Sequence, residues 1–268
     1  MTHITPANAG DSVQLTIDAG VGTVTIASSR GALDNAAKNA LREVLQRLSD
    51  DVEVRAVILT GSGPTFCVGQ DLREHAASLA ADATAAWDTL QEHYIPIVTA
   101  LATMPKPVIA AVNGTAAGAG AALAFACDLR FIADDAVFHL GFASIGLSFD
   151  SGMSWTLPRL IGLGRATELM LLTRPVAAPE ALALGLATEV VPAADLSAVV
   201  TTVAGELAAG PTIAFGAAKQ AVAYAAGHGL LDALDMEAGL QTLAGTTEDH
   251  AAAVQAFLAK RPPSFRGR

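Results

Sequence analysis

Apolar and polar positions alternate along the first part of the chain, as they do in half-buried strands. Residues Val13 to Ile17 and Gly22 to Ile26 show this alternation on either side of Gly20, which predicts a β-hairpin. From Asn35 to Leu48, apolar residues recur at helical spacing with charged side chains between them, which predicts an amphipathic helix. The apolar run from Val54 to Thr60 predicts a buried strand that ends in a glycine-rich loop.

A long apolar stretch in the middle of the chain, Pro107 to Cys127, has only Asn113 and Thr115 as polar side chains. Its length approaches that of a membrane span. The turn pair Asn113-Gly114 and the glycines that follow divide the stretch into two parts. We therefore expect a buried strand, Val108 to Val112, then a separate helix, and no membrane span.

Helices and strands alternate on both sides of this stretch. A helix is expected at about 87–102 and a pair of strands at 128–133 and 137–140. A helical region that begins at Ser154 is broken at 162–164. This alternation predicts an α/β core with parallel strands.

The predicted α/β core covers residues 12–192 and follows a flexible N-terminal segment, residues 1–11. After Pro192 the sequence becomes Ala-rich and helical, and no strand is expected as far as Leu258. Residues 193–268 are therefore predicted to be all helical. Such a region serves either as an oligomer contact or as a cap on the core, and the sequence leaves both open.

Charge and cysteine content narrow the functional classes. The net charge is −10, and the 16 Lys and Arg residues form no basic stripe, which argues against nucleic acid as a partner. Cys67 and Cys127 are the only cysteines and form no C-x-x-C pair, so neither a disulfide scaffold nor a metal site is expected. The polar residues 1–11 resemble no secretory signal, and we expect a cytoplasmic protein.

Two glycine-containing motifs carry a family resemblance. Residues Pro64 to Arg73, PTFCVGQDLR, resemble the F-x-x-G-x-D-L signature of the enoyl-CoA hydratase/isomerase (crotonase) superfamily. Residues Lys106 to Gly120, KPVIAAVNGTAAGAG, resemble the K-P-x-I-A-A-V-N-G-x-A-x-G-G-G of the same superfamily. Shorter matches lie at 126–128, 157–162, 181–187 and 257–261, so the resemblance covers nearly the whole chain.

The resemblance implies a crotonase-like spiral of repeating β-β-α units with a C-terminal helical region used in oligomer formation. It implies a homotrimer or a hexamer made of two trimers. The implied substrate is an acyl-CoA thioester, and coenzyme A is then part of the substrate, so no separate cofactor is expected.

The resemblance also implies an oxyanion hole made of two backbone N–H groups, those of Gln70 and Ala119. Negative charge builds on the thioester oxygen when an α-proton leaves, and each preorganised donor contributes roughly 10²–10³ in rate. Both residues lie near expected helix starts, where unpaired N–H groups favour negative charge. Ala119 replaces a glycine of the family motif, so it can serve as the second oxyanion donor only if its backbone conformation is one that alanine tolerates.

Residues along the first motif are implied to bind coenzyme A, with Arg73 as a cation for its phosphates. Arg30 is a second candidate for this role, and both arginines are equally well explained as solvated surface residues. The implied contacts in the motif are Val68, Gln70, Asp71, Leu72 and Arg73.

Two positions depart from the hydratases of the superfamily, which use two glutamates to activate water. Here Ala122 and Phe142 occupy those positions, and both are expected to line the substrate pocket. Neither side chain can take or give a proton, so hydration by the route that uses two carboxylates should fail.

One acid remains, since Asp150 falls where isomerase and dehalogenase relatives carry a catalytic aspartate. Desolvation beside Ala122 and Phe142 would raise the pKa of its carboxyl, as suits a general base. The alternative is that Asp150 caps a helix that begins near Ser151.

The predicted reaction is enoyl-CoA isomerisation, in which Asp150 moves a proton along the acyl chain. A weak enoyl-CoA hydratase and a non-catalytic acyl-CoA-binding protein are the alternatives. In a less favoured route Asp150 is a nucleophile on an aromatic acyl group flanked by Phe149 and Trp155. No histidine base is assigned, because His139 reads as a core or edge residue and His75 and His93 as surface residues.

Overall fold

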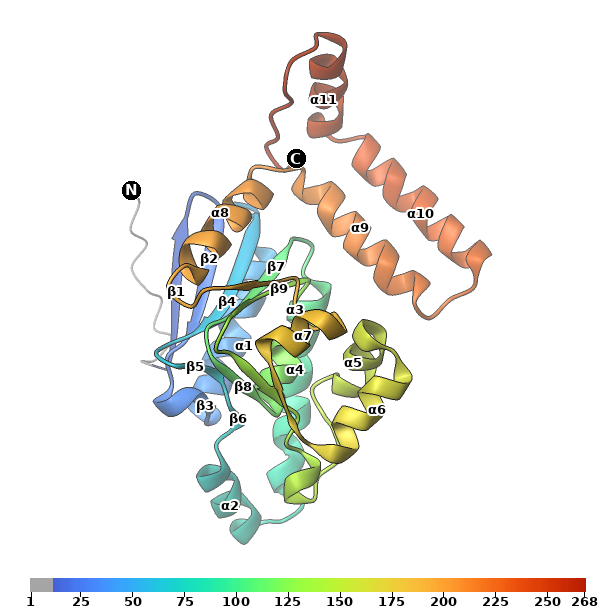
Figure 1. The fold of residues 1–268 in the computed structure, drawn as a ribbon. Helices are drawn as coiled ribbons and strands as arrows, with labels where there is room; N and C mark the ends of the chain where they lie inside the picture. Colours follow the sequence, from blue (N-terminus) through green and yellow to red (C-terminus); the bar gives the residue numbers. More distant parts are fainter. Residues whose placement is uncertain (1–11) are drawn as a thin grey trace.

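The computed structural model describes residues 12–268, and the segment 1–11 that was expected to be flexible lies outside the described residues. Its centre is a six-stranded sheet with the order β1-β2-β4-β7-β9-β12 (Figure 1). The strands are β1 (Val13–Asp18), β2 (Val21–Ile26), β4 (Ala56–Gly61), β7 (Val108–Val112), β9 (Leu129–Ala133) and β12 (Glu189–Val191). The pair β1 and β2 forms the predicted antiparallel hairpin, and the strands from β2 to β12 are parallel.

A second, smaller sheet has the order β11-β10-β8-β5, and a separate pair joins β3 to β6. Their bounds are β3 (Ala32–Leu33), β5 (Thr65–Cys67), β6 (Gly69–Gln70), β8 (Thr115–Ala117), β10 (Val137–His139) and β11 (Pro175–Ala177). Each strand β4, β7 and β9 of the large sheet is thus followed by a short strand of the small one. This is the expected spiral of β-β-α turns.

The prediction that 128–133 and 137–140 form a pair of strands is wrong in one respect. Both are strands, but β9 lies between β7 and β12, whereas β10 lies between β8 and β11. The chain turns from one sheet to the other between them, so neither strand hydrogen-bonds to the other.

The helix α1 (Asn35–Asp50) confirms the amphipathic prediction, with Leu41, Leu45 and Leu48 fully buried. The side chain of Asp34 caps its first turn by accepting from the Ala37 N–H at 2.8 Å, and such caps contribute about 1 kcal/mol. At the other end, the buried Lys106 donates to the carbonyl of Leu48 at 2.7 Å.

The predicted helix at 87–102 is more irregular than its pattern suggested. A 3₁₀ turn at Ala85–Trp87 and a π-helical segment at Leu90–Tyr94 precede the regular helix α3 (Ile95–Thr103). The π-helical segment turns side chains away from the positions that a regular helix would give them.

The remaining helices of the core follow the order of the spiral. They are α2 (Leu72–Ala81), α4 (Ala119–Ala126), α5 (Met153–Ile161), α6 (Leu163–Leu172) and α7 (Ala178–Leu184). The apolar stretch 107–127 is divided as predicted, into β7, β8 and the fully buried α4.

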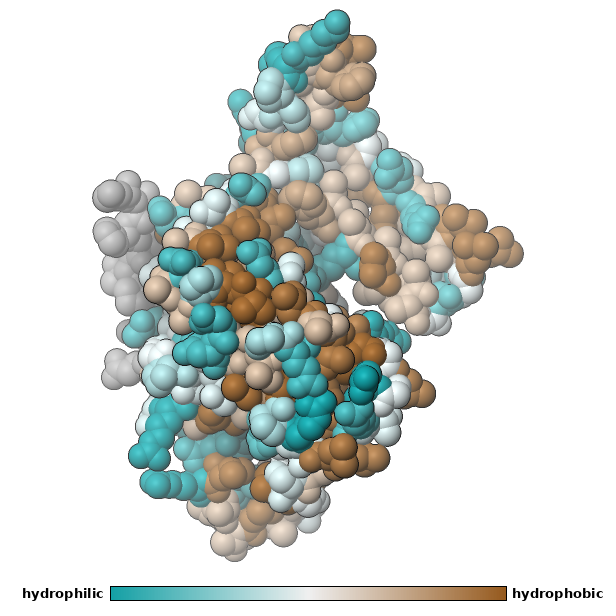
Figure 2. Space-filling view, in the orientation of Figure 1, coloured by the Kyte–Doolittle hydropathy of each residue, from teal (hydrophilic) through white to brown (hydrophobic). Residues whose placement is uncertain are grey.

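The regular elements within residues 193–268 are all helices, as expected, and residues 259–268 follow the last one without regular structure. The helices are α8 (Leu196–Ala208), α9 (Thr212–Ala225), α10 (Leu230–Gly245) and α11 (Glu248–Leu258). Helix α8 packs on the six-stranded sheet, whereas α9 to α11 project away from the body (Figure 1). Figure 2 shows apolar surface at the tip of this arm where α9 turns into α10. Leu230 and Leu231, the first residues of α10, are 74% and 76% exposed.

A search of residues 12–268 for helices long and apolar enough to cross a membrane finds no single one. Helices α8 and α9 meet the length and composition requirement only together, and they are bent by 101° at the break between them.

Candidate active site

A cavity of about 250 Å³ lies where the two glycine-containing motifs meet the segment around Asp150. Of the residues expected from the sequence, six line it: Val68, Gln70, Leu72, Ala119, Phe142 and Asp150. They come from three separate turns of the spiral, namely the β5 to α2 connection, the start of α4 and the loop after β10. The fold therefore collects in one place residues that are up to about 80 positions apart in the sequence.

Glycines let the two motifs approach closely. Gly69 has φ +80°, and a Cβ built on it would lie 3.0 Å from the backbone nitrogen of Ala119. A Cβ on Gly120 would lie 2.0 Å from the carbonyl oxygen of Cys67, so no side chain fits there. The backbone of Gln70 and the start of α4 are therefore held against each other.

The backbone at Ala119 is compatible with alanine. The preceding Gly118 takes the positive φ, +52°, while Ala119 is not among the non-glycine residues with positive φ. Ala119 is the first residue of α4, and the first N–H groups of a helix have no partner within the helix. The methyl group that replaces a glycine hydrogen thus leaves the N–H in place without backbone strain.

Asp150 is a half-buried acid in this cavity and, among the described residues that line it, the only carboxylate. Burial raises the pKa of its carboxyl, and the Ser151 hydroxyl, which donates to Oδ1 at 2.6 Å, opposes that shift. The expected direction of the pKa shift is therefore confirmed. The alternative role as a helix cap is wrong, because α5 begins at Met153 after Gly152 and has no side-chain cap.

The sequence did not point to the group that surrounds the Gln70 side chain. The Tyr94 hydroxyl donates to Gln70 Oε1 at 2.7 Å, and Lys38 Nζ donates to the same oxygen at 3.2 Å. Tyr94 and Lys38 are 2% and 1% exposed. In the sequence, Lys38 looks like any solvated lysine on an amphipathic helix. The only sign that it is buried was its position on the apolar face of that helix.

Histidine placement differs from the sequence expectation. His93 was expected on the surface but is buried, with Nδ1 3.1 Å from Thr89 Oγ1, because it lies in the π-helical segment. His75 lines the cavity edge-on to Trp87, with ring centroids 5.1 Å apart. His139 also lines the cavity and is half-buried.

Comparison with known proteins decides the family. A family model described as enoyl-CoA hydratase/isomerase matches residues 16–268. The chain belongs to this enoyl-CoA hydratase/isomerase family. The resemblance carried by the two motifs is therefore confirmed.

Among the family's curated proteins, a probable enoyl-CoA hydratase of Rhodobacter capsulatus is 40% identical over 259 residues, which are 96% of this chain and 98% of the relative. A 1,2-epoxyphenylacetyl-CoA isomerase of Escherichia coli is 40% identical over 85% of this chain and 87% of its own. A 4-chlorobenzoyl coenzyme A dehalogenase of Arthrobacter is 36% identical over 75% and 74%. The relatives share acyl-CoA chemistry and differ in their reaction.

Solved structures of the family confirm the crotonase fold. A structure described as a putative enoyl-CoA hydratase/isomerase from Mycobacterium abscessus has a TM-score of 0.91 and 42% sequence identity. The match covers 96% of this chain and 100% of that chain. A putative enoyl-CoA hydratase from Streptomyces coelicolor has the same TM-score, 0.91, at 37% identity over 100% of both chains.

Four expected ligand contacts of this family member lie outside the cavity lining. Ala122 is fully buried in α4, and Arg30 and Arg73 are exposed on the surface. Asp71 caps α2 by accepting from the N–H groups of Arg73 at 2.8 Å and Glu74 at 3.0 Å, and these bonds lower its pKa. The expectation that Ala122 lines the pocket is wrong in this structure.

The aromatic pair expected beside Asp150 is arranged differently. Phe149 packs edge-on against Phe142, with ring centroids 5.5 Å apart, and is not a lining residue. Trp155 is 46% exposed, and the Arg159 guanidinium lies 4.1 Å from its ring centroid. Trp87 is the tryptophan that lines the cavity.

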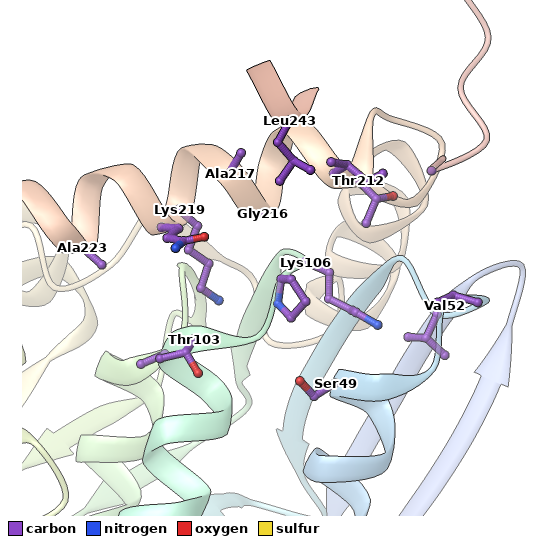
Figure 3. Close-up of a pocket in the computed structure, with 16 residues that line it drawn as sticks. Ser49, Val52, Thr103, Lys106, Thr212, Gly216, Ala217, Lys219, Ala223 and Leu243 are labelled. Atoms are coloured by element: carbon purple, nitrogen blue, oxygen red, sulfur yellow. The ribbon is translucent and has the colours of Figure 1, made fainter. Parts of the chain in front are cut away.

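A larger cavity of about 660 Å³ lies between α9 and the ends of α1 and α3 (Figure 3). Its charged groups are engaged by the protein itself, since Lys219 donates to Asp128 at 2.8 Å and Lys106 to Leu48 O at 2.7 Å. No group of three or more His, Cys, Asp or Glu in the described part of the chain is arranged to hold a metal.

Proposed function

We propose that the protein is an acyl-CoA isomerase that shifts a carbon–carbon double bond by moving a proton through Asp150. The observation that carries the proposal is that Gln70, Ala119 and Asp150 line one cavity in which, among the described residues, Asp150 is the only carboxylate. One carboxylate suffices to take a proton at one carbon and return it at another. Hydration by the superfamily's usual route needs two.

The reaction follows from these groups. With a 3-enoyl thioester, Asp150 takes a proton from C2, and the electrons of that C–H bond spread over a dienolate with negative charge on the thioester oxygen. The Gln70 and Ala119 N–H groups donate to that oxygen. The protonated Asp150 then gives the proton to C4, which leaves the double bond between C2 and C3 and returns the carboxylate.

The other polar groups of the cavity suit this chemistry. Burial raises the pKa of the Tyr94 phenol, so the phenol stays neutral and acts as a donor, not as a base. The raised pKa of Asp150 makes its carboxylate a stronger base than an exposed aspartate. The oxyanion donors are backbone groups, which no titration removes.

The acyl group is proposed to be apolar or to carry a ring, because Trp87, Tyr94 and Phe142 line the cavity. Two relatives are named for acyl groups that contain a ring, epoxyphenylacetyl and chlorobenzoyl. Coenzyme A would run outward along Val68 and Leu72 toward the exposed Arg73 and Arg30. No cofactor beyond this substrate is proposed.

We also propose that the protein forms an oligomer and is located in the cytoplasm. The apolar end of the arm, with Leu230 and Leu231 exposed, favours a homotrimer or hexamer over a monomer. A cytoplasmic location, with neither nucleic acid nor membrane as partner, agrees with the composition.

Weak hydration is the second candidate function, because the relative from Rhodobacter capsulatus is named a probable enoyl-CoA hydratase. Binding of acyl-CoA without turnover is the third. Both are separated from isomerisation by the products. Purified protein is given a 3-enoyl-CoA and, separately, a 2-enoyl-CoA, and the products are followed by chromatography.

The expected result is conversion of the 3-enoyl to the 2-enoyl thioester, with kcat about 10²–10⁴-fold lower in Asp150→Asn. Rapid formation of 3-hydroxyacyl-CoA from the 2-enoyl thioester would contradict isomerisation as the main activity. Tight binding without any product would identify a silent acyl-CoA-binding protein.

A further inference from the structure

A polar cluster surrounds the Gln70 side chain, and Gln70 and Thr89 line both the cavity that contains Asp150 and a second cavity. The cluster consists of Lys38 on α1, Glu74 on α2, Thr89 just before the π-helical segment, and His93 and Tyr94 within that segment. These side chains come from segments that the fold brings together only at this point. The mechanism above uses none of them except Tyr94.

Lys38 is the centre of this cluster, and its ammonium group meets three acceptors. Its Nζ donates to Thr89 Oγ1 at 2.9 Å and to Gln70 Oε1 at 3.2 Å, and it forms an ion pair with Glu74 Oε1 at 3.6 Å. An ammonium group has three N–H donors, and two of those of Lys38 are used in these hydrogen bonds, whereas Glu74 Oε1 is held by charge alone and has no hydrogen-bond partner among the described residues. Burial lowers the pKa of Lys38, and the nearby carboxylate of Glu74 opposes that shift.

The oxygen of the Gln70 carboxamide accepts two hydrogen bonds. It accepts from Tyr94 at 2.7 Å and from Lys38 at 3.2 Å. A carbonyl oxygen has two lone pairs, and here each has a donor from a buried side chain. The cluster therefore fixes the side-chain orientation of Gln70 and adds to the β3–β6 pairing, in which Gln70 lies opposite Leu33, in holding its backbone.

Gln70 needs such fixation because it stands between two open spaces. It lines the cavity of about 250 Å³ on one side and a second cavity of about 320 Å³ on the other. Lys38, Glu74 and His93 line only the second.

We propose that Lys38, assisted by Tyr94, is a positioning residue that acts through the Gln70 carboxamide to aim the Gln70 backbone N–H at the thioester oxygen. The inference rests on the proposed function, since it assigns a task to that N–H. Lys38 touches no substrate atom. It acts from the second cavity through one side-chain oxygen.

If the role of Lys38 were structural only, its replacement should have the same effect as replacement of Lys106. Lys106 is also buried, at 3% exposure, and donates to the carbonyl oxygens of Leu48 and Asp51 at 2.7 Å each. Lys106 lines the larger cavity beside α9 and not the one with Asp150. Lys106→Met is therefore the matched control for the loss of a buried, hydrogen-bonded lysine.

The test is the absorption of a bound acyl-CoA whose carbonyl is conjugated to an aromatic ring, with cinnamoyl-CoA as the probe. Hydrogen-bond donors that pull charge onto the carbonyl oxygen move the absorption band of the conjugated acyl group to longer wavelength. This red shift reports the alignment of the oxyanion donors in the folded, ligand-bound protein and does not respond to a change in stability.

We expect Lys38→Met to bind cinnamoyl-CoA with less than half of the wild-type red shift. Its kcat for isomerisation falls about tenfold while KM changes by less than about threefold, as for partial loss of one oxyanion donor. Gln70→Leu, which keeps the backbone N–H, shows the same loss. The double variant loses no more than either single one, because both changes break the same link.

The full wild-type red shift in Lys38→Met, or losses that add in the double variant, would overturn the inference and leave the isomerase proposal intact. A comparable loss of red shift in Lys106→Met would also overturn it. If Lys38→Met does not fold, Tyr94→Phe and Gln70→Leu carry the test, and an undiminished red shift in both overturns it. Wild-type protein that binds the probe without any red shift would overturn the oxyanion pair itself, and this inference with it.

Discussion

The backbone nitrogen of Ala119 lies so close to Gly69 that a Cβ added to this glycine would be 3.0 Å from it. Gly69 immediately precedes Gln70, so this contact sets the spacing between the two proposed oxyanion donors. The motif from β5 to α2 and the motif from β7 to α4 meet at this point.

Gly69→Ala should therefore impair both folding and chemistry. The positive φ alone makes alanine unfavourable by about 1 kcal/mol, and the new methyl group also pushes α4 away. We expect kcat to fall at least about tenfold, as after displacement of one oxyanion donor. Gly63→Ala is the matched control, because Gly63 has φ +65° and nothing within 4 Å of the added Cβ. Equal kcat losses in both variants would contradict the assignment.

Ser151 should tune the pH dependence of turnover. Its hydroxyl donates to Asp150 at 2.6 Å and lowers the pKa that burial raises. In Ser151→Ala that pKa rises further, so the acidic limb of the profile of kcat/KM against pH should move to higher pH. The rate at high pH should change little. Ser154→Ala, an exposed neighbour on α5, should leave the limb in place, and an unmoved limb in Ser151→Ala would argue against Asp150 as the base.

Asp150→Asn should stabilise the protein at neutral pH. Folding raises the pKa of Asp150, so its contribution to stability is present below the unfolded pKa of about 3.9 and is lost as pH rises through the folded value. As the pH rises, the carboxyl must ionise although burial favours its neutral form. We expect Tm to rise by roughly 2–4 °C, the effect of about 1 kcal/mol in a protein of this size.

The Tm difference between Asp150→Asn and wild type should shrink as the pH is lowered from 7 toward 4, because Asp150 gains its proton as the pH falls and then becomes neutral like asparagine. Differential scanning calorimetry at both pH values checks this. A Tm gain that is independent of pH would contradict the raised pKa.

The pair Lys219 and Asp128 should anchor α9 to the core. Lys219 Nζ donates to Asp128 Oδ2 at 2.8 Å, and Asp128 in turn accepts from the Val108 N–H at 2.8 Å. Lys219→Met leaves a carboxylate whose pKa burial already raises without its cation, which costs about 1–3 kcal/mol. Urea unfolding of both single variants and of the double variant with Asp128→Asn measures the coupling. Additive losses would mean that the pair contributes nothing.

Long periodic segments could be predicted from the sequence, because their pattern is set by which residues face the core. The hairpin and α1 are examples, and β7 could be predicted from an unbroken apolar run. The short strands β5, β6, β8 and β10 could not, since two or three residues carry no period and their pairing depends on contacts distant in the chain. The sorting of β9 and β10 into different sheets was missed for that reason.

The resemblance to the family identified part of the site. Gln70 and Ala119 were found because they lie in the two motifs, and Asp150 was found because it falls where relatives carry a catalytic aspartate. Lys38, Tyr94 and Trp87 were missed, because nothing local distinguishes a lysine or an aromatic residue that meets a glutamine from another element. The burial of His93 depended on a π-helical segment that helical periodicity does not reveal.

Proton transfer through Asp150 in the cavity that also contains Gln70 and Ala119 is the central claim, and incorporation of solvent deuterium tests it most directly. A 3-enoyl-CoA is incubated in D₂O with wild-type protein or Asp150→Asn, and the recovered thioesters are analysed by mass spectrometry and NMR. We predict 2-enoyl-CoA with deuterium at C4 and exchange at C2 of the remaining substrate, both lost in Asp150→Asn. Equal deuterium incorporation by the two proteins, or a product that carries a hydroxyl group at C3 as its main form, would contradict the claim.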